Sequence, residues 1–499
     1  MKLVKSEVEA MRVNGRSLLA IVLCEALILS SLGCGPRRTF APQVPLSPAV
    51  FKPLQESLQK SYLELFAIAP TLEFSQAQIE EMRRYLNEAE KYCEGQFESR
   101  SSQYEKELQQ AQSDLRRESA KLDESQRHDM HCRIQNLRAL KSQTEVLASQ
   151  AIPVAYENKR AKLELVEKWP DQFRAIKQEI ANGSYQGRRW GDVKDIGFRE
   201  IAPKQEDDVK DGQEAIKQMK QAGMFPPEIE NKAVKEYVTS LAEKIAKRSD
   251  LQVPVKVTVL NSKEINAFAL PGGFLFVQRG LLEAAEDESQ LVGVLAHEIA
   301  HAAARHGNKL MKKATISSIV YQAAQVAALI LTGGAAGVGA YYALQYGFYG
   351  LGLVLSLNLL GVSREYELEA DQLGIQYAWN NGYDPTGFIR FFDKMATHEG
   401  YVNGASWFRT HPPFYDRMVH AQREIMFLPK KSGLIKQAPE FERMKKELTS
   451  VTREAEKEEK NKPSLLAPEQ GCASPERIEY KPGQPIESIC SLPTKQEAR

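Results

Sequence analysis

The spacing of apolar side chains changes along the 499-residue chain and separates regions of different predicted structure. Residues 35–74 begin with a proline-rich stretch and are predicted to form a tether. Residues 75–183 are rich in Glu, Lys, Gln and Arg, and apolar residues such as Ile79, Met82 and Leu86 recur at the spacing of one helix face. This pattern predicts long amphipathic helices that form a hairpin or coiled-coil-like region.

Residues 184–428 combine helical spacing with short alternating runs. Residues 253–259 and 274–277 have the pattern of strands, and a turn of one proline and two glycines precedes the second. Residues 228–249 and 288–313 have helical spacing instead. The combination predicts an α+β domain that is mainly α, with a small sheet, preceded by the long helical hairpin region.

Residues 314–363 contain no charged side chain. The run is long enough for two membrane-spanning helices, which would make the chain an integral-membrane protein. Its glycines and glutamines also suit helices that are packed inside a protein, and we expect this buried arrangement. The remaining residues, 429–499, are predicted to form a charged helix followed by a proline-rich tail.

Residues 1–34 have the pattern of a bacterial lipoprotein signal peptide, in which basic residues precede an apolar run that ends at Cys34. Cleavage there would leave a lipidated Cys34 at the start of the mature chain. Glu25 and Ser31 depart from the pattern, so an uncleaved membrane anchor is the alternative. The signal peptide predicts a periplasmic protein that is lipid-anchored to the cell membrane or outer membrane.

Outside this leader, four cysteines remain: Cys93, Cys132, Cys472 and Cys490. Disulfides persist in an oxidising periplasm, although four cysteines allow three connectivities. Cys93 and Cys132 both lie in the predicted helical region, so we expect one disulfide to clasp the hairpin. The two cysteines of the tail would form the other. The alternative is that the four cysteines are unpaired, buried thiols.

The overall composition excludes few functions. The chain is 42% hydrophobic and 26% charged, which is ordinary for globular proteins with buried cores. Its formal net charge of +1 gives no reason to expect binding to nucleic acid. The charged helical region, 75–183, is expected to be a solvated spacer. The alternative is that it binds a partner or self-associates.

A metal-binding pattern lies in the apolar segment 291–301, where His297 and His301 are separated by one helical turn and Glu298 follows the first histidine. On a helix, positions i and i+4 share a face, so both imidazoles can reach one ion. Glu298 lies about 100° around the helix and can reach a water at the metal instead. The pattern therefore predicts a hydrolase that uses one Zn²⁺ per chain.

A catalytic zinc needs a third protein ligand and an open position. The strongest candidate is Glu367, in an acidic segment that also contains Asp371 one helical turn later. One carboxylate of this pair can bind the metal while the other accepts a hydrogen bond from a ligating imidazole. Glu365 and Glu369 compete for the ligand role, but we expect them to form a solvated charged face.

Five segments, matched in order and spacing, connect the chain to a known family. They are Asn266-Ala-Phe-Ala-Leu-Pro-Gly-Gly273, HEIAH at 297–301, Arg305-His306-Gly307, SREYELEAD at 363–371 and His411-Pro-Pro-Phe-Tyr-Asp-Arg417. The chain resembles the HtpX/BepA-like zinc metallopeptidases, which are HExxH gluzincins and include the CAAX prenyl proteases and mitochondrial inner-membrane relatives. The resemblance covers residues 185–425 and implies a zincin-like metallopeptidase domain with an active-site helix.

The resemblance also implies roles for single residues. By position, His297, His301 and Glu367 match the zinc ligands, Glu298 the general base and Asp371 the aspartate that follows the glutamate ligand. His411 and Arg417 match a downstream His-Pro motif that approaches the zinc in relatives. We expect His411 either to stabilise the oxyanion or to be a fourth zinc ligand that keeps the enzyme latent. The alternative is a structural role, in which His411 caps the following helix.

Two further expectations concern residues around the active-site helix. Asn266, Ala267 and Phe268 can belong to an edge strand, to which an extended peptide adds by main-chain hydrogen bonds. The alternative is an ordinary buried strand. His306 lies five residues after His301, off the ligand face, and is expected to be structural rather than catalytic.

The leading functional prediction is a zinc endopeptidase of the bacterial cell envelope, with Glu298 as the general base. Its substrates and partners would be misfolded, stalled or misassembled envelope proteins, and it would meet the membrane through its lipid anchor. The alternative is an envelope assembly factor or chaperone with a latent zinc site. The presence of Glu298 favours the enzyme, because binding alone needs no general base.

Overall fold

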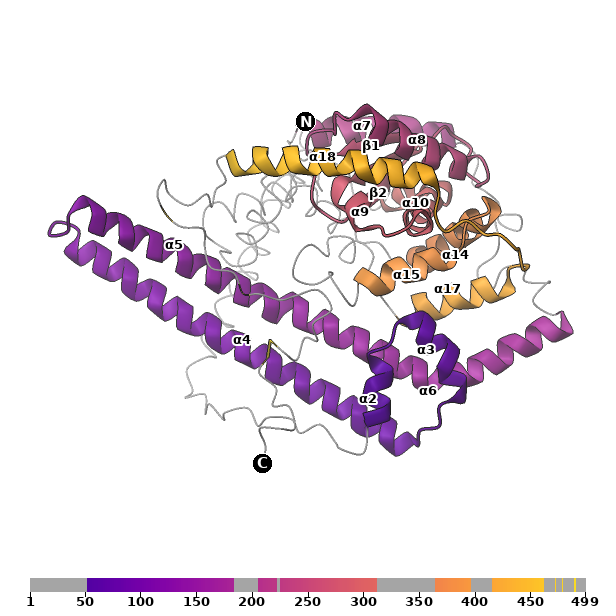
Figure 1. Cartoon of the computed structure of the whole chain (residues 1–499), viewed down its shortest axis with the longest axis horizontal. Coiled ribbons are helices and arrows are strands. Elements are labelled where there is room, and N and C mark those ends of the chain that lie inside the picture. The colour runs from indigo at the N-terminus through magenta and orange to yellow at the C-terminus, as the bar shows by residue number, and fades with distance from the viewer. Residues whose placement is uncertain are drawn as a thin grey trace, which may run out of the picture. The chain divides into compact units, whose positions relative to one another are not determined.

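Figure 1 shows a computed structural model of the chain, which describes residues 52–183, 205–221, 225–311, 364–395 and 415–461 together with 472, 478, 489 and 490. The chain divides into two compact units, Met1–Gln43 and Val44–Arg499, and every described residue belongs to the second. These residues are mainly helical and contain one three-stranded sheet. The predicted fold class, α+β and mainly α, is confirmed.

Some predictions fall outside the described residues. These are the leader with Cys34, the proline-rich start of the predicted tether, the uncharged run at 314–363, His411 and most of the proline-rich tail. In the ranges that the structure does describe, no helix combines the length and the apolar character needed to cross a membrane.

The predicted hairpin consists of α4 (Gln76–Glu118) and α5 (Glu124–Val146), which pack side by side (Figure 1). Both helices begin with a capping box, at Ser75 and Asp123, in which the side chain of the third helical residue binds back to the capping residue. Near the turn, a small apolar cluster joins the helices: Leu108, Ala111, Ile134 and Leu137.

Residues 52–71 are helical and packed, so the predicted tether over 35–74 is wrong for this part. Three short elements, α2 (Lys52–Leu58), α3 (Tyr62–Ile68) and η2 (Ala69–Thr71), contact α6 (Ile152–Asn182). The indole of Trp169 in α6 donates a hydrogen bond to the carbonyl oxygen of Phe66 at 3.0 Å. The physical reason is a set of apolar side chains that this contact buries: Leu54, Leu58, Tyr62, Leu65, Phe66 and Ala69.

Two disulfides join the helical region to the C-terminal tail, Cys93 to Cys490 and Cys132 to Cys472, with Cα–Cα distances of 5.0 and 5.3 Å. The predicted clasp between Cys93 and Cys132 is therefore wrong. The turn of the hairpin lies at residues 119–123, so the residue of α4 that faces Cys132 is about 17 positions beyond Cys93. That offset corresponds to about 25 Å along the helix axis, which no disulfide can span.

The sheet contains β1 (Lys256–Leu260), β2 (Ala267–Leu270) and β3 (Phe274–Gln278) in the order β1-β3-β2. β3 is parallel to β1 and antiparallel to β2. The hairpin between β2 and β3 turns at Gly272 and Gly273, whose φ angles of 82° and 79° suit glycine. β2 is thus an edge of the sheet.

One face of the sheet is covered by α7 (Gln205–Gln221), and α10 (Glu288–Ala303) contacts β2 and β3. Beneath α7 lies an apolar cluster with stacked aromatic rings at its centre. It is formed by Ala215, Met219, Leu260, Phe268, Leu270, Phe274 and Phe276.

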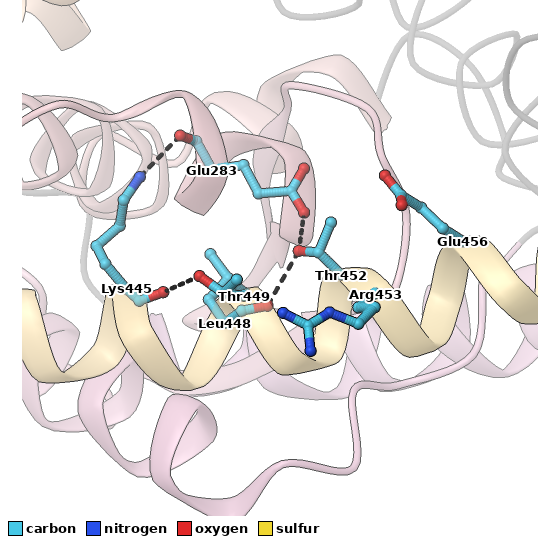
Figure 2. Close-up of a pocket in the computed structure, with 7 residues that line it drawn as sticks. All are labelled: Glu283, Lys445, Leu448, Thr449, Thr452, Arg453 and Glu456. Atoms are coloured by element: carbon cyan, nitrogen blue, oxygen red, sulfur yellow. Dashed lines mark hydrogen bonds between the residues drawn. The ribbon is translucent and has the colours of Figure 1, made fainter.

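The charged C-terminal helix, α18 (Pro439–Asn461), packs against α8 (Lys232–Ala246) and α9 (Arg279–Ala284). Figure 2 shows the pocket of about 390 Å³ that lies between Glu283 of α9 and the side chains of α18. The Lys445 ammonium closes one end of it and donates to the carbonyl oxygens of Leu282, Glu283 and Ala285 at 2.8–3.0 Å. Lys445 therefore caps the C-terminal end of α9 and ties α18 to it.

Candidate metal centre

The helix that carries the two motif histidines, α10, is almost entirely buried. It contacts α8, α14 (Arg364–Asn380) and α15 (Thr386–Lys394). Gly374 permits the close approach of α14, because a Cβ at that position would lie 2.9 Å from the Cα of His297. The two helices that bear the candidate ligands are therefore held together at the level of His297.

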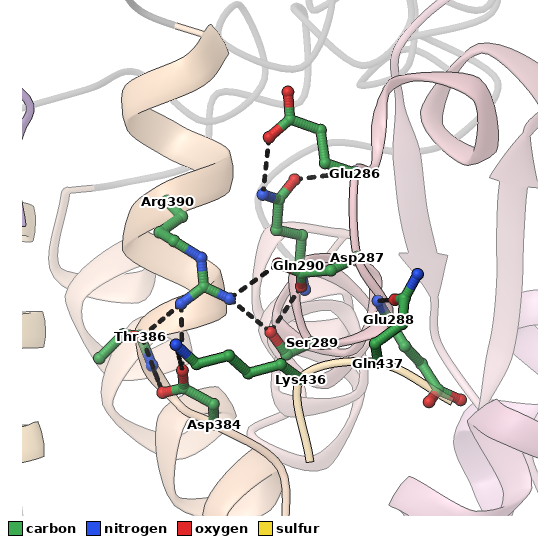
Figure 3. A network of polar contacts seen from close by, with 10 residues as sticks. All are labelled: Glu286, Asp287, Glu288, Ser289, Gln290, Asp384, Thr386, Arg390, Lys436 and Gln437. Atoms are coloured by element: carbon green, nitrogen blue, oxygen red, sulfur yellow. Dashed lines mark hydrogen bonds and ion pairs between the residues drawn. The ribbon is translucent and has the colours of Figure 1, made fainter. Parts of the chain in front are cut away.

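A polar network fixes the N-terminal end of α10 (Figure 3). Asp287 caps the helix by accepting from the backbone N–H of Gln290 at 2.9 Å. Arg390 of α15 donates to Asp287 at 3.0 Å and to Asp384 at 3.1 Å. The backbone N–H of Ser289 donates to the carbonyl oxygen of Lys436 at 3.0 Å, so the segment that leads into α18 also anchors the helix.

The structure brings His297, His301 and Glu367 together. Nε2 of His297 and Nε2 of His301 lie 3.0 Å apart, and the two Glu367 oxygens lie 3.6 and 3.3 Å from these nitrogens. One ligand atom from each residue falls within 4.8 Å of the others, and the three side chains are buried. Two imidazole nitrogens and one carboxylate are the donor set of many catalytic zinc sites, so these residues fit a zinc ion.

Burial and the neighbouring carboxylates together shift the pKa values of the two histidines in opposite directions. Burial lowers the pKa of His297, but hydrogen bonds with Asp371 and Glu367 outweigh it and raise the value to about 9. For His301 burial outweighs the hydrogen bond with Glu367, and the pKa is lowered from 6.5. His301 is thus ready to bind a metal at neutral pH, whereas His297 first has to lose a proton.

Comparison with known proteins agrees with this geometry. Residues 228–425 match the model of peptidase family M48. This part of the chain is therefore similar to an M48 metallopeptidase domain and is named the M48 domain. This domain contains all three candidate ligands.

Named relatives match the same part of the chain. A putative beta-barrel assembly-enhancing protease of Vibrio cholerae is 30% identical over 41% of this chain and 41% of its own length. The beta-barrel assembly-enhancing protease of Escherichia coli K12 is 27% identical over 39% and 40%. The mitochondrial metalloendopeptidase OMA1 of Schizosaccharomyces pombe is 33% identical over 35% and 48%. The chain thus spans less than half the length of each of these relatives.

In the M48 domain, Asp371 and Arg417 lie directly behind the candidate ligands. Oδ1 of Asp371 lies 2.9 Å from Nδ1 of His297, the ring nitrogen that faces away from Glu367. Arg417, from α17 (Tyr415–Phe427), donates to both Asp371 oxygens at 2.7 and 2.6 Å and to Glu367 at 2.9 Å. Burial raises the pKa of Asp371, but Arg417 and His297 more than offset this, so the carboxyl pKa stays below 3.8.

Glu298 follows His297 on α10 and is 1% exposed. Its negative charge acts on Arg417, whose pKa it helps to raise. The buried carboxylate is therefore close to the cluster of charges at the candidate ligands. Glu298 is not indicated as a ligand, because the residues spaced to hold a metal ion here are His297, His301 and Glu367.

The sequence reasoning missed a chain of contacts at His301. Nδ1 of His301 lies 2.8 Å from Nδ1 of His306, and Nε2 of His306 lies 3.2 Å from Glu369. Glu369 was expected on a solvated face, and this expectation is wrong, since its side chain is 18% exposed and faces His306. Glu365 is exposed, as predicted.

The predicted single helix over 288–313 is also wrong, because the chain turns between α10 and α11 (His306–Met311). Arg305 has a φ of 59° at this turn, in the left-handed region that side chains other than glycine rarely adopt. The turn brings His306 back to His301. The Arg305-His306-Gly307 segment was the only hint of this turn in the sequence reasoning, but the spacing of its residues does not reveal that Arg305 adopts a left-handed conformation.

The residues predicted for a substrate edge strand lie at and beside β2. Ala267 and Phe268 are 0% and 3% exposed, and the Phe268 ring stacks on Phe276 at 4.8 Å. Asn266 is buried directly before the strand, and its side-chain amide has no hydrogen-bond partner among the residues that the structure describes. The side chains thus belong to the interior, while the backbone of β2 pairs with β3 alone among the described strands.

A second group of metal-ligand types lies in the helical region and consists of His128, Cys132 and Cys472. Its two sulfurs are bonded to each other, and Nε2 of His128 lies 3.6 Å from Sγ of Cys132. A disulfide sulfur is not a thiolate ligand. The group therefore differs in chemistry from the one at α10.

Proposed function

We propose that the chain is a zinc-dependent endopeptidase in which His297, His301 and Glu367 hold the metal. The observation that carries the proposal is the convergence of these three donors from two helices, with Asp371 behind His297. Bound zinc would supply Lewis acidity to a water and to the scissile carbonyl. The M48 match and the printed names of the relatives support hydrolysis of peptide bonds.

The remaining chemistry belongs to side chains of the domain. Glu298 takes a proton from the attacking water and passes it to the leaving amine. Asp371 accepts a hydrogen bond from His297 and so holds that ring with Nε2 towards the metal. Arg417 neutralises the two buried carboxylates that would otherwise repel each other.

The substrate is proposed to bind as an extended strand. β2 is an edge among the described strands. The carbonyl oxygen of Asn266 accepts from the backbone N–H of Gln278 in β3 at 3.0 Å, so in the alternating ladder the main-chain groups of Ala267 and Ala269 face away from β3. These groups are offered to a peptide, which adds by backbone hydrogen bonds. This mode accepts many sequences, because it reads the backbone and not the side chains. It suits an enzyme that acts on unfolded or misassembled proteins.

The proposed compartment is the bacterial envelope, with Cys34 as the lipid anchor. The two disulfides support it, because such bonds persist in oxidising compartments. The name of the Escherichia coli relative, a beta-barrel assembly-enhancing protease, agrees with quality control of envelope proteins as the role. Incorporation of radioactive palmitate in bacteria tests the anchor. It should label the chain and be lost in Cys34→Ser, and equal labelling of both would refute the anchor.

The proposed activity is tested with the chain from residue 35 onward and its Glu298→Gln variant. Zinc content and cleavage of fluorescently labelled casein are measured for each, with Glu365→Gln as a matched control at an exposed carboxylate. Zinc in all three, with cleavage lost only in Glu298→Gln, is the expected result. Zinc without cleavage by the unmutated chain would instead favour a latent assembly factor, and absence of zinc would refute the metal site.

A further inference from the structure

The second histidine of the motif has a polar neighbour of its own on the side away from the metal. Nε2 of His301 faces His297 and Glu367, whereas Nδ1 lies 2.8 Å from Nδ1 of His306. On its other side, His306 places Nε2 3.2 Å from Oε2 of Glu369. Both histidines are buried, so bulk water does not replace these contacts.

Only one placement of protons satisfies this chain of contacts when Nε2 of His301 binds a metal. Nδ1 of His301 then carries the proton and donates it to Nδ1 of His306. His306 must accept at Nδ1, so its own proton lies on Nε2 and is donated to Glu369. The carboxylate at the end of the chain fixes the tautomer of both rings.

Three features of the fold hold His306 in this position. Arg305 adopts its left-handed φ of 59° directly before His306, and such strained residues cluster at functional sites. The guanidinium of Arg305 is clamped by both oxygens of Asp208, from α7, at 2.6 and 2.5 Å. The ring of Tyr366 stacks on His306 with 4.5 Å between centroids and an angle of 11°.

We infer that His306 and Glu369 are positioning residues that fix the tautomer and orientation of the metal ligand His301. His297 is oriented directly by Asp371, and His301 is oriented by Glu369 through the intervening His306. Both imidazoles of the motif thus end on a carboxylate. The inference rests on the proposed zinc site, and extends it to two residues outside the group of three candidate ligands.

The test measures the zinc dissociation constant of the full chain by competition with a chromogenic chelator. His306→Phe keeps a ring for Tyr366 to stack on but removes the acceptor for the His301 proton. His306→Asn places an amide oxygen close to where Nδ1 lies, and so restores the acceptor. Loss of such a partner typically weakens metal binding about 10–100-fold.

The expected result is weakening of about 10–100-fold in His306→Phe, about 10-fold in Glu369→Ala and less than about 3-fold in His306→Asn. Glu365→Ala, an exposed carboxylate on the same helix, is the control and should match the unmutated chain. Unchanged affinity in His306→Phe would overturn the inference and leave the zinc site intact. Equal weakening in Phe and Asn variants would also overturn it, because packing alone would then explain the loss.

A second measurement does not depend on any variant folding. Nitrogen chemical shifts of the histidine rings in the zinc-loaded protein distinguish a protonated from an unprotonated ring nitrogen. Protons on Nδ1 of His301 and Nε2 of His306 support the inferred chain of hydrogen bonds from His301 through His306 to Glu369. A proton on Nδ1 of His306 overturns it, and failure of the unmutated chain to bind zinc would overturn the proposed function as well.

Discussion

Replacing Arg417 by methionine tests how strongly the metal centre depends on one buried cation. The Arg417 side chain is 0% exposed, and it is paired with Asp371 and Glu367, which are each 1% exposed. Methionine retains part of the apolar stem but leaves both carboxylates without this cation. Removal of one partner of a buried ion pair costs about 3–5 kcal/mol. For a domain of about 200 residues, such as the M48 domain at 228–425, this loss of stability corresponds to a fall of about 6–20 °C in melting temperature.

The measurement is thermal unfolding of the metal-free protein, followed by circular dichroism. Arg443→Met is the matched control, because Arg443 pairs with Glu440 at 2.7 Å, close to the 2.6 Å of Arg417 and Asp371, but both side chains are more than half exposed. Exposed pairs contribute about 0–1 kcal/mol. If Arg417→Met lowered the melting temperature no more than Arg443→Met, the assignment of a structural ion pair at the metal centre would be refuted.

Three further outcomes follow from the same geometry. Because the pKa of His297 is raised to about 9, zinc must displace a proton from this histidine at neutral pH. The affinity for zinc, measured by chelator competition, should therefore rise about tenfold per pH unit from pH 7 and level off above pH 9. An affinity that does not change with pH would contradict this. Gly374→Ala places a Cβ 2.9 Å from the Cα of His297, so we expect about 1–3 kcal/mol of destabilisation and weaker zinc binding. Urea unfolding measures the destabilisation. A curve that matches the unmutated protein would show that α14 and α10 have room to separate. Lys445→Met removes the cation that caps α9, and about 1–3 kcal/mol of stability should be lost. Limited proteolysis should then cut α18 faster than in the unmutated protein. An unchanged rate would show that other contacts hold this helix.

The candidate metal ligands were accessible to sequence reasoning because their pattern depends on local spacing. His297 and His301 are one helical turn apart, and Glu367 and Asp371 are likewise one turn apart on a second helix. Their mutual approach needed only that α10 and α14 pack, and the apolar pattern of α10 indicated a buried helix. The strands β1 and β3 were predicted for the same local reason.

The missed features depend on geometry that spacing does not encode. The contact between His301 and His306 requires the left-handed Arg305, which no apolar period reveals. Whether Cys93 and Cys132 face each other depends on where α4 ends, because an error of a few residues in the turn moves the facing position by several ångströms. Their partners lie in the tail, more than 300 residues away, where no local spacing reveals them. The burial of α2 and α3 was detectable from the helical spacing of Leu54, Leu58 and the residues after them, but the preceding prolines obscured it.

The two disulfides also determine what a single break in the chain would do. Cys93 and Cys132 lie before the M48 domain, while Cys472 and Cys490 lie after it. A peptide bond cut anywhere between residues 132 and 472, including by another copy of the enzyme, therefore leaves two fragments that remain covalently joined at two points. Such a nicked molecule would migrate as one species on a denaturing gel until a reductant is added, so self-cleavage within the catalytic domain would neither release a fragment nor be visible without reduction.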